Sequence, residues 1–218
     1  MTSQETQLPE AAPDGKSGTP RRAKHERRRQ EIIDAAAEVF RRKGYSDASI
    51  QDIADEVGLL KGSLYHYIEA KEDLLFEVLT GVYELARQNI DKVAAMDDLG
   101  PVEKLRAYIK LHLEFNATHT TKIATYYHEF ELVGPERRPI IVEQRKQFER
   151  FITDLIVAGK ESGEIDARVD PKIGAYLILG AMNWTYTWYR PEGRVSPDEL
   201  GDLAAQLLVD GILSAKRD

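Results

Sequence analysis

The chain has 218 residues, of which 42% are apolar, and its net charge is −7. This length accommodates one or two domains, and the lack of cysteine excludes disulfides, thiolate metal sites and a cysteine nucleophile. No apolar run approaches the roughly 18 residues that a membrane span needs, and the polar N-terminus lacks the apolar region of a secretory signal. We therefore expect a cytoplasmic protein with no membrane partner.

Residues 1–20 are rich in Thr, Ser, Pro, Gly and Gln without apolar periodicity, which predicts a disordered tail. Basic residues are concentrated directly afterwards, since residues 21–43 hold nine Arg or Lys against four acids. Phosphate binding depends on local rather than total charge, so this stretch fits contact with nucleic acid. Residues 21–24 form a predicted basic arm, which either enters a minor groove or is a solvated run of charge.

Three short helices are expected next. Apolar residues at helical spacing predict a helix over about 26–43, and Gly44 supplies its C-terminal stop. A second helix is expected to begin at Ser49, where Asp52 three residues later completes a capping box. The predicted third helix covers 61–67, with a polar and aromatic surface of the size that fits a DNA major groove.

The remaining two-thirds of the chain is acidic and also predicts helices, because apolar residues keep helical spacing and Gly or Pro marks the ends. The expected bounds are 71 to about 93, 101–119, 122–133, 136–161, 170–190 and 196–216. No segment alternates with the period of a strand, so the expected fold class is all-α, without an internal repeat.

A series of residues at fixed spacings runs through the three short helices into the fourth. It consists of Ile32-Ile33-Asp34-Ala35-Ala36, Phe40, Gly44-Tyr45, Ser49-Ile50, Ile53-Ala54, Val57-Gly58, Gly62-Ser63-Leu64-Tyr65-His66-Tyr67 and Lys71-Glu72-Asp73-Leu74. This series resembles the DNA-binding domain of the TetR family of bacterial transcriptional regulators. The resemblance implies a helix-turn-helix domain over 21–72 and a six-helix ligand-binding and dimerisation domain over 73–218.

The resemblance also implies which residues meet DNA. The implied contacts are Arg21, Arg22, Ser49, Lys61, Gly62, Ser63, Tyr65, His66, Tyr67 and Lys71. Residues of the 61–67 helix would lie at the groove surface, with tyrosine hydroxyls near phosphates or base edges, and Lys71 would pair with a phosphate. Packing against the first helix is the alternative for both tyrosines, and Leu64 would point inward as a core residue. Leu60 departs from the family, in which a Ser or Thr usually caps the recognition helix.

The other helices would enclose a ligand cavity. The candidate lining residues are Tyr83, His112, Phe115, Tyr126, Tyr127, Phe130, Phe148, Met182, Trp184 and Trp188, with His112, Glu129 or Asn183 as orienting polar groups. Ordinary core packing is the alternative for each aromatic residue. The aromatic segment over 183–191 is similar to a helix of TetR-family repressors of lipid, acyl-CoA and steroid catabolism, which suggests an acyl-CoA effector. His112, His119 and His128 do not have the spacing of a metal site, so no metal is expected.

The resemblance thus implies a repressor that binds a palindromic double-stranded DNA operator as a homodimer and is released by a small hydrophobic ligand. The last two long helices would form the dimer interface. No phosphate-binding glycine loop, metal motif or nucleophile elbow is present, so we expect no enzyme and no cofactor beyond the effector. The alternatives are an all-α interaction protein or enzyme without specific DNA binding, and a regulator that responds to an aromatic or cationic drug-like ligand.

Overall fold

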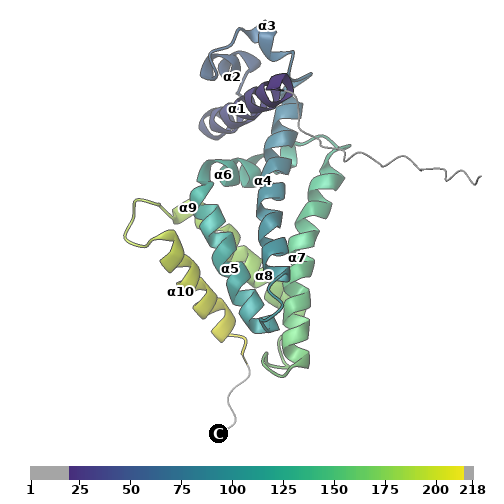
Figure 1. The fold of residues 1–218 in the computed structure, drawn as a ribbon, viewed down its shortest axis with the longest axis vertical. Helices are drawn as coiled ribbons and strands as arrows, with labels where there is room; N and C mark the ends of the chain where they lie inside the picture. The colour runs from purple at the N-terminus through teal and green to yellow at the C-terminus, as the bar shows by residue number, and fades with distance from the viewer. Residues whose placement is uncertain (1–19, 214–218) are drawn as a thin grey trace, which may run out of the picture.

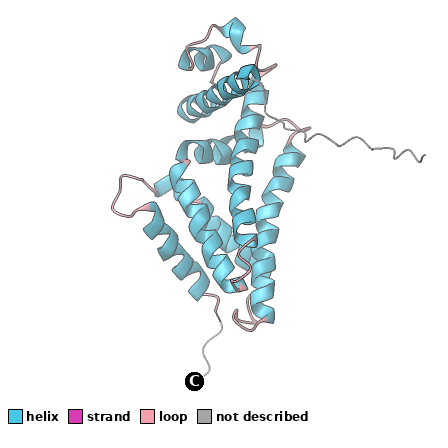
Figure 2. Ribbon diagram, in the orientation of Figure 1, coloured by secondary structure: helices cyan, strands magenta, loops and turns pink. Residues whose placement is uncertain are grey.

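The computed structural model describes residues 20–213. Of the tail predicted over residues 1–20, residues 1–19 lie outside this range and Pro20 begins the first helix. Within this range every regular element is a helix, and one isolated bridge joins Ile165 and Leu213 (Figure 2). The helices are α1 (Pro20–Lys43), α2 (Ile50–Glu56), α3 (Lys61–Leu64), α4 (Lys71–Ala94), α5 (Pro101–Thr118), α6 (Thr120–Glu129), the 3₁₀ helix η1 (Phe130–Leu132), α7 (Arg138–Glu161), α8 (Pro171–Asn183), α9 (Thr185–Trp188) and α10 (Pro197–Asp210). The predicted all-α class is confirmed.

Helices α1, α2 and α3 gather at one end of the molecule, at the top of Figure 1. The backbone turns between them at Gly44 and Gly58, whose φ angles of 77° and 66° favour glycine. Ser49 caps α2 as predicted: its side chain accepts from the Asp52 backbone N–H, and the Asp52 carboxylate accepts from the Ser49 backbone N–H.

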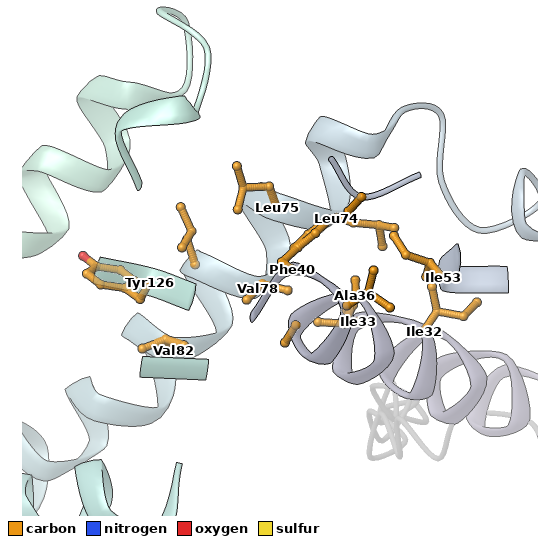
Figure 3. Packing of buried hydrophobic residues seen from close by; sticks show 14 of the residues in the cluster. Ile32, Ile33, Ala36, Phe40, Ile53, Leu74, Leu75, Val78, Val82 and Tyr126 are labelled. Atoms are coloured by element: carbon orange, nitrogen blue, oxygen red, sulfur yellow. The ribbon is translucent and has the colours of Figure 1, made fainter. Parts of the chain in front are cut away.

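Helix α4 runs from this end into the body of the molecule (Figure 1). Its first turns carry Leu74, Leu75 and Val78, which pack with α1 residues such as Ile33 and Phe40 in one buried cluster (Figure 3). The same cluster continues to residues of α5 and α6. One hydrophobic core therefore connects the three N-terminal helices to the body, and a shift of α4 or α6 must be felt by α1.

The body is a bundle in which α5 packs against α4, α7 and α10, and α8 packs against α7. Its buried residues form a second cluster around Tyr108, Ile109 and Ile152. Among residues 20–213, no helix is long and apolar enough to cross a membrane.

Several predicted boundaries differ from the structure. The expected arm over 21–24 lies within the first turns of α1. The helix predicted over 170–190 is interrupted at Trp184. Near this break the Thr185 hydroxyl donates to the Met182 carbonyl, and such a side-chain bond competes with the backbone hydrogen bonds of a helix. Counted as one interrupted helix, α8 and α9 complete the predicted six helices of the body among the described residues. Helix α10 ends at Asp210, and the predicted end near residue 216 lies outside the described range.

Candidate nucleic-acid interface and ligand cavity

The recognition helix is shorter than predicted, because α3 covers one turn and residues 65–67 continue as a turn. Leu64 is fully buried, as expected, and anchors this segment to the core. Leu60 stands at the N-cap without a side-chain hydrogen bond, so the predicted loss of the cap is confirmed. Its side chain is 80% exposed, which places a bare apolar group at the start of the recognition helix.

The outward surface of this segment carries most of the residues predicted to meet DNA. Lys61, Gly62, Tyr65 and His66 are exposed, and Ser63 is half-buried. Around Gly62, no atom of the structure lies within 4 Å of an added Cβ, so protein packing does not require a glycine there. Glycine is, however, the residue that lets a backbone approach a ligand closely.

The other predicted DNA contacts are placed differently. Arg21 and Arg22 are exposed on α1. Tyr67 is half-buried and stacks on His25 of α1, with ring centroids 4.8 Å apart and planes inclined by 25°. Packing against the first helix, the alternative considered for the two tyrosines, therefore describes Tyr67.

Lys71 faces the protein rather than solvent. Its Nζ donates to the carbonyls of Tyr45, Ser46 and Ala48 at 2.8, 3.3 and 2.7 Å, and lies 4.4 Å from the centroid of the Tyr45 ring. All three N–H groups of the ammonium are thus used inside the protein. In the DNA-free protein Lys71 therefore fixes the turn between α1 and α2 to the start of α4, and its phosphate contact stays a prediction.

A cavity of about 470 Å³ lies in the body, between α4, α5, α6, α7 and α8. Its lining is mostly apolar and aromatic. The lining residues are Val82, Tyr83, Ala86, His112, Phe115, Asn116, Ile123, Tyr126, Tyr127, Val142, Arg145, Lys146, Phe148, Glu149, Tyr176, Leu179, Gly180 and Asn183.

The structure brings five of the predicted ligand contacts to this cavity, namely His112, Phe115, Tyr126, Tyr127 and Asn183, together with the candidates Tyr83 and Phe148. Four of the predicted contacts lie elsewhere. Trp184 and Trp188 are 63% and 54% exposed, although Thr185 and Tyr189 of the same segment are buried. Neither tryptophan lines the cavity, and nor does Met182, a candidate lining residue that is buried in the core.

Glu129 and Phe130, at the end of α6, are also not cavity residues. The Glu129 carboxylate is buried and accepts from the Tyr45 backbone N–H at 3.1 Å, so it belongs to the junction with the N-terminal helices. Phe130 packs at the edge of the first core cluster, and the Arg145 guanidinium lies 4.4 Å from its ring centroid.

The cavity has a neutral interior and basic residues beside it. Burial lowers the pKa of His112 to about 4, and the neighbouring Asn183 offsets only part of that shift, so the imidazole is neutral at pH 7. Arg145 and Lys146 are exposed lining residues, and Glu149 is the single acid among the lining residues. Sequence patterns gave no sign of Arg145 or Lys146, because an exposed basic pair on an amphipathic helix is ordinary surface.

Arg137 and Arg138, at the start of α7, make contacts within the protein. Arg137 pairs with Asp73 of α4 at 2.6 Å, and its guanidinium lies 5.0 Å from the centroid of the Phe76 ring. Arg138 donates to the Glu131 carbonyl. Within residues 20–213, no group of three or more His, Cys, Asp or Glu side chains is arranged to hold a metal ion.

Helix α6 connects the cavity to the N-terminal helices. One face carries the lining residues Tyr126 and Tyr127. Another carries Thr125, whose hydroxyl donates to the Ala37 carbonyl at 3.2 Å, and Lys122, which pairs with Asp34 at 2.7 Å. With the Glu129 contact to Tyr45, three polar links hold α6 to α1 and the turn that follows it.

Exposed apolar residues are frequent on α8 and α10 and at the tryptophans at the two ends of α9. These residues are Ile173, Tyr176, Leu177, Trp184, Trp188, Leu203 and Leu207, all at least 47% exposed. Exposed apolar residues in this number usually mark a protein–protein interface. We call this set the α8–α10 face.

Comparisons with known proteins agree with this arrangement. Residues 32–78 match the family described as bacterial regulatory proteins, tetR family, and residues 98–212 match the tetracyclin repressor-like C-terminal domain. The HTH-type transcriptional repressor KstR2 of Rhodococcus jostii is 30% identical over 190 residues, which cover 86% of this chain and 92% of that protein.

Two solved structures show the same fold. The ketosteroid transcriptional regulator KstR2 of Mycobacterium tuberculosis has a TM-score of 0.80 at 26% identity and covers 86% of this chain and 96% of its own. AibR in complex with isovaleryl coenzyme A and operator DNA has a TM-score of 0.76 at 28% identity and covers 84% of this chain and 98% of its own.

Proposed function

Because this chain belongs to the TetR family of bacterial transcriptional regulators, we propose that it is a repressor released from its operator by a hydrophobic acyl-coenzyme A. Family membership confirms the prediction of a helix-turn-helix regulator rather than an enzyme. The operator, the homodimer and the ligand class are parts of the proposal, and each has its own support.

The proposed DNA surface is formed by Lys61, Gly62, Ser63, Tyr65 and His66, with Arg21 and Arg22 on the neighbouring α1. The exposure of most of these groups and the open space at Gly62 support close approach to a major groove. Ser49 supports this surface indirectly, because it caps the N-terminus of α2. The relative AibR was solved with operator DNA, which supports the same docking here.

The proposed homodimer forms through the α8–α10 face. Seven exposed apolar side chains on these helices lose contact with water when two copies pair. A two-fold pair presents two recognition helices, so its operator would be a palindrome with half-sites in successive major grooves.

The cavity carries the ligand proposal. An apolar interior of about 470 Å³ suits an acyl chain, and the basic pair Arg145 and Lys146 suits the phosphates of coenzyme A outside it. A cationic drug-like ligand is disfavoured, since the lining holds two Arg or Lys side chains against Glu149 alone. Isovaleryl coenzyme A in AibR is an example of this ligand class in a relative.

Release of DNA would follow from the links between the cavity and the N-terminal helices. A ligand that displaces Tyr126 and Tyr127 moves α6, which three polar contacts hold to α1 and its following turn. Helix α4 offers a second connection between the cavity and the N-terminal helices. Its residues Val82 and Tyr83 line the cavity, and Lys71 holds its start to the turn that follows α1. Only a ligand that prefers the DNA-free arrangement can drive this release.

The test is fluorescence anisotropy of the protein on labelled DNA from beside its own gene, against scrambled DNA, with a panel of acyl-coenzyme A thioesters. We expect specific binding that one class of thioester reverses. Specific binding that no thioester reverses would reject the ligand class and keep the repressor. Equal binding to both DNAs would reject specific recognition of that site.

Arg145→Ala tests the proposed contact with the ligand phosphates, and Arg150→Ala is its control. Both are exposed arginines of α7, but Arg150 pairs with Glu143 away from the cavity. We expect the Arg145 variant to need about tenfold more thioester for release, because a charged hydrogen bond contributes about 1.5 kcal/mol. The Arg150 variant should respond like the unmodified protein.

A further inference from the structure

Two buried side-chain acceptors of cavity-lining residues, Oδ1 of Asn116 and Oδ1 of Asn183, accept no hydrogen bond from any described residue. Asn116 of α5 is 2% exposed and lines the cavity. Its amide nitrogen donates to the Met182 carbonyl of α8 at 3.1 Å, while its Oδ1 is buried and accepts no hydrogen bond from any described residue. The Asn116 Oδ1 is thus an unsatisfied acceptor of a residue in the cavity wall.

The orientation of this amide is fixed by its neighbour. Exchanging the oxygen and nitrogen of Asn116 would set two oxygens, Oδ1 and the Met182 carbonyl, against each other 3.1 Å apart. The Oδ1 of Asn183, the second amide at the cavity, is likewise buried without a partner, but the His112 imidazole lies beside it as a nearby donor. Asn116 Oδ1 has no such neighbouring donor among the described contacts, so its partner is sought in the cavity contents.

We propose that the ligand carries a hydroxyl group on its apolar part and that this hydroxyl donates to Asn116 Oδ1. The inference rests on the cavity being the effector site of the proposed function. A ketone or ether of the same size offers only acceptors and would leave Oδ1 unpaired, which is costly for a buried amide. A charged ammonium would donate as well, but it would lose its hydration in a neutral interior beside two basic side chains.

The experiment compares probes that differ in one group and contain no coenzyme A. Calorimetric titrations would use decanoic acid, a series of hydroxydecanoic acids with the hydroxyl at different positions, and the oxo acids with a ketone at the same positions. We expect at least one hydroxy acid to bind about 5- to 10-fold more tightly than decanoic acid and than the matching oxo acid. A series with no such hydroxy acid would overturn the inference.

Asn116→Leu is the matched variant, and Asn89→Leu is its control. Asn89 is a buried asparagine whose amide also donates to a carbonyl of another helix, that of Leu111 at 3.2 Å, but it does not line the cavity. The preference for the hydroxy acid should vanish in the Asn116 variant and persist in the Asn89 variant. If the Asn116 variant does not fold, the comparison of hydroxy and oxo acids on the unmodified protein still decides.

The two proposals can fail separately. The thioesters of the same acids would be added to the complex of protein and operator DNA. Hydroxy acids that bind tightly while no thioester releases DNA would reject the coenzyme A ligand and keep the hydroxyl. Thioesters that release DNA without any preference for a hydroxyl would keep the proposed function and reject the role of Asn116.

Discussion

The outward surface of α3 and the cavity in the body are assembled in different ways. The recognition segment draws its side chains from seven consecutive residues, 61–67, which are held by the buried Leu64 and by the stacking of Tyr67 on His25. The cavity draws its lining from five helices between residues 82 and 183. The first surface depends on a local motif, whereas the second depends on how distant helices pack. A local change should therefore affect DNA contact alone, and a packing change should affect several properties at once.

The strongest test of this contrast breaks DNA binding without touching the recognition segment. Leu177→Glu combined with Leu207→Glu places two carboxylates on the α8–α10 face, where both leucines are at least 70% exposed. We expect monomers, and a loss of operator affinity on the order of 100-fold because one half-site then binds alone. Sedimentation and anisotropy measure the two effects. Ile140→Glu, an exposed apolar site on α7, is the control; a double variant that stays dimeric would refute the interface.

A second test separates two lysines that both belong to the predicted DNA motif. Lys71→Ala should lower the free energy of unfolding by about 2 to 3 kcal/mol, because the ammonium satisfies three carbonyls. Lys61→Ala should leave stability unchanged and reduce the slope of log affinity against log salt by about 1. Urea unfolding and salt titration of DNA binding measure these effects. A reduced salt slope for Lys71→Ala at unchanged stability would instead support its phosphate contact.

A third test uses the titration of His112 in the cavity wall. The pKa of His112 is about 4 in the folded protein, below its usual 6.5, so the unfolded chain binds a proton that the folded chain does not. Stability should therefore be full above pH 6.5 and fall as pH drops toward 4, by about 2 kcal/mol between pH 7 and 5. His112→Gln should remove this component of the pH dependence. The control His128→Gln changes an exposed histidine and keeps His112; equal slopes for both variants would contradict the assignment.

The smallest expected effect concerns the junction between the two regions. Glu129→Ala leaves the Tyr45 N–H without its carboxylate and should weaken the ligand-induced loss of DNA affinity by about 1 kcal/mol. The ligand affinity of the DNA-free protein should stay the same, since Glu129 does not line the cavity. Titrations with and without DNA measure both quantities, and Glu131→Ala is an exposed control. A changed ligand affinity in the absence of DNA would return Glu129 to the ligand site.

Sequence patterns predicted those features of the fold that depend on residues close together in the chain. The cap of α2 by Ser49 and Asp52, the burial of Leu64 and the end of α7 at residue 161 all depend on neighbouring residues, and the structure confirms each.

The cavity was predicted only in part, because its lining depends on how distant helices pack. An aromatic residue at helical spacing fits a cavity wall and an outer surface equally well. Trp184 and Trp188 were assigned inward because the pattern does not show that α8 is interrupted at residue 184. The contacts of Lys71 with three carbonyls were not predicted because these partners lie 23 to 26 residues away along the chain. Asn116 carried no sequence signal.

Leu60 has a thermodynamic consequence for recognition. Its side chain is 80% exposed at the start of α3, where most of its neighbours are polar. On the proposed docking, the methyl group of a thymine is the apolar feature of the major groove that could cover it. Burial of apolar surface gives a negative heat-capacity change and does not depend on counterion release. Part of the operator affinity should therefore persist at high salt and strengthen on mild warming, unlike the part that Lys61 supplies.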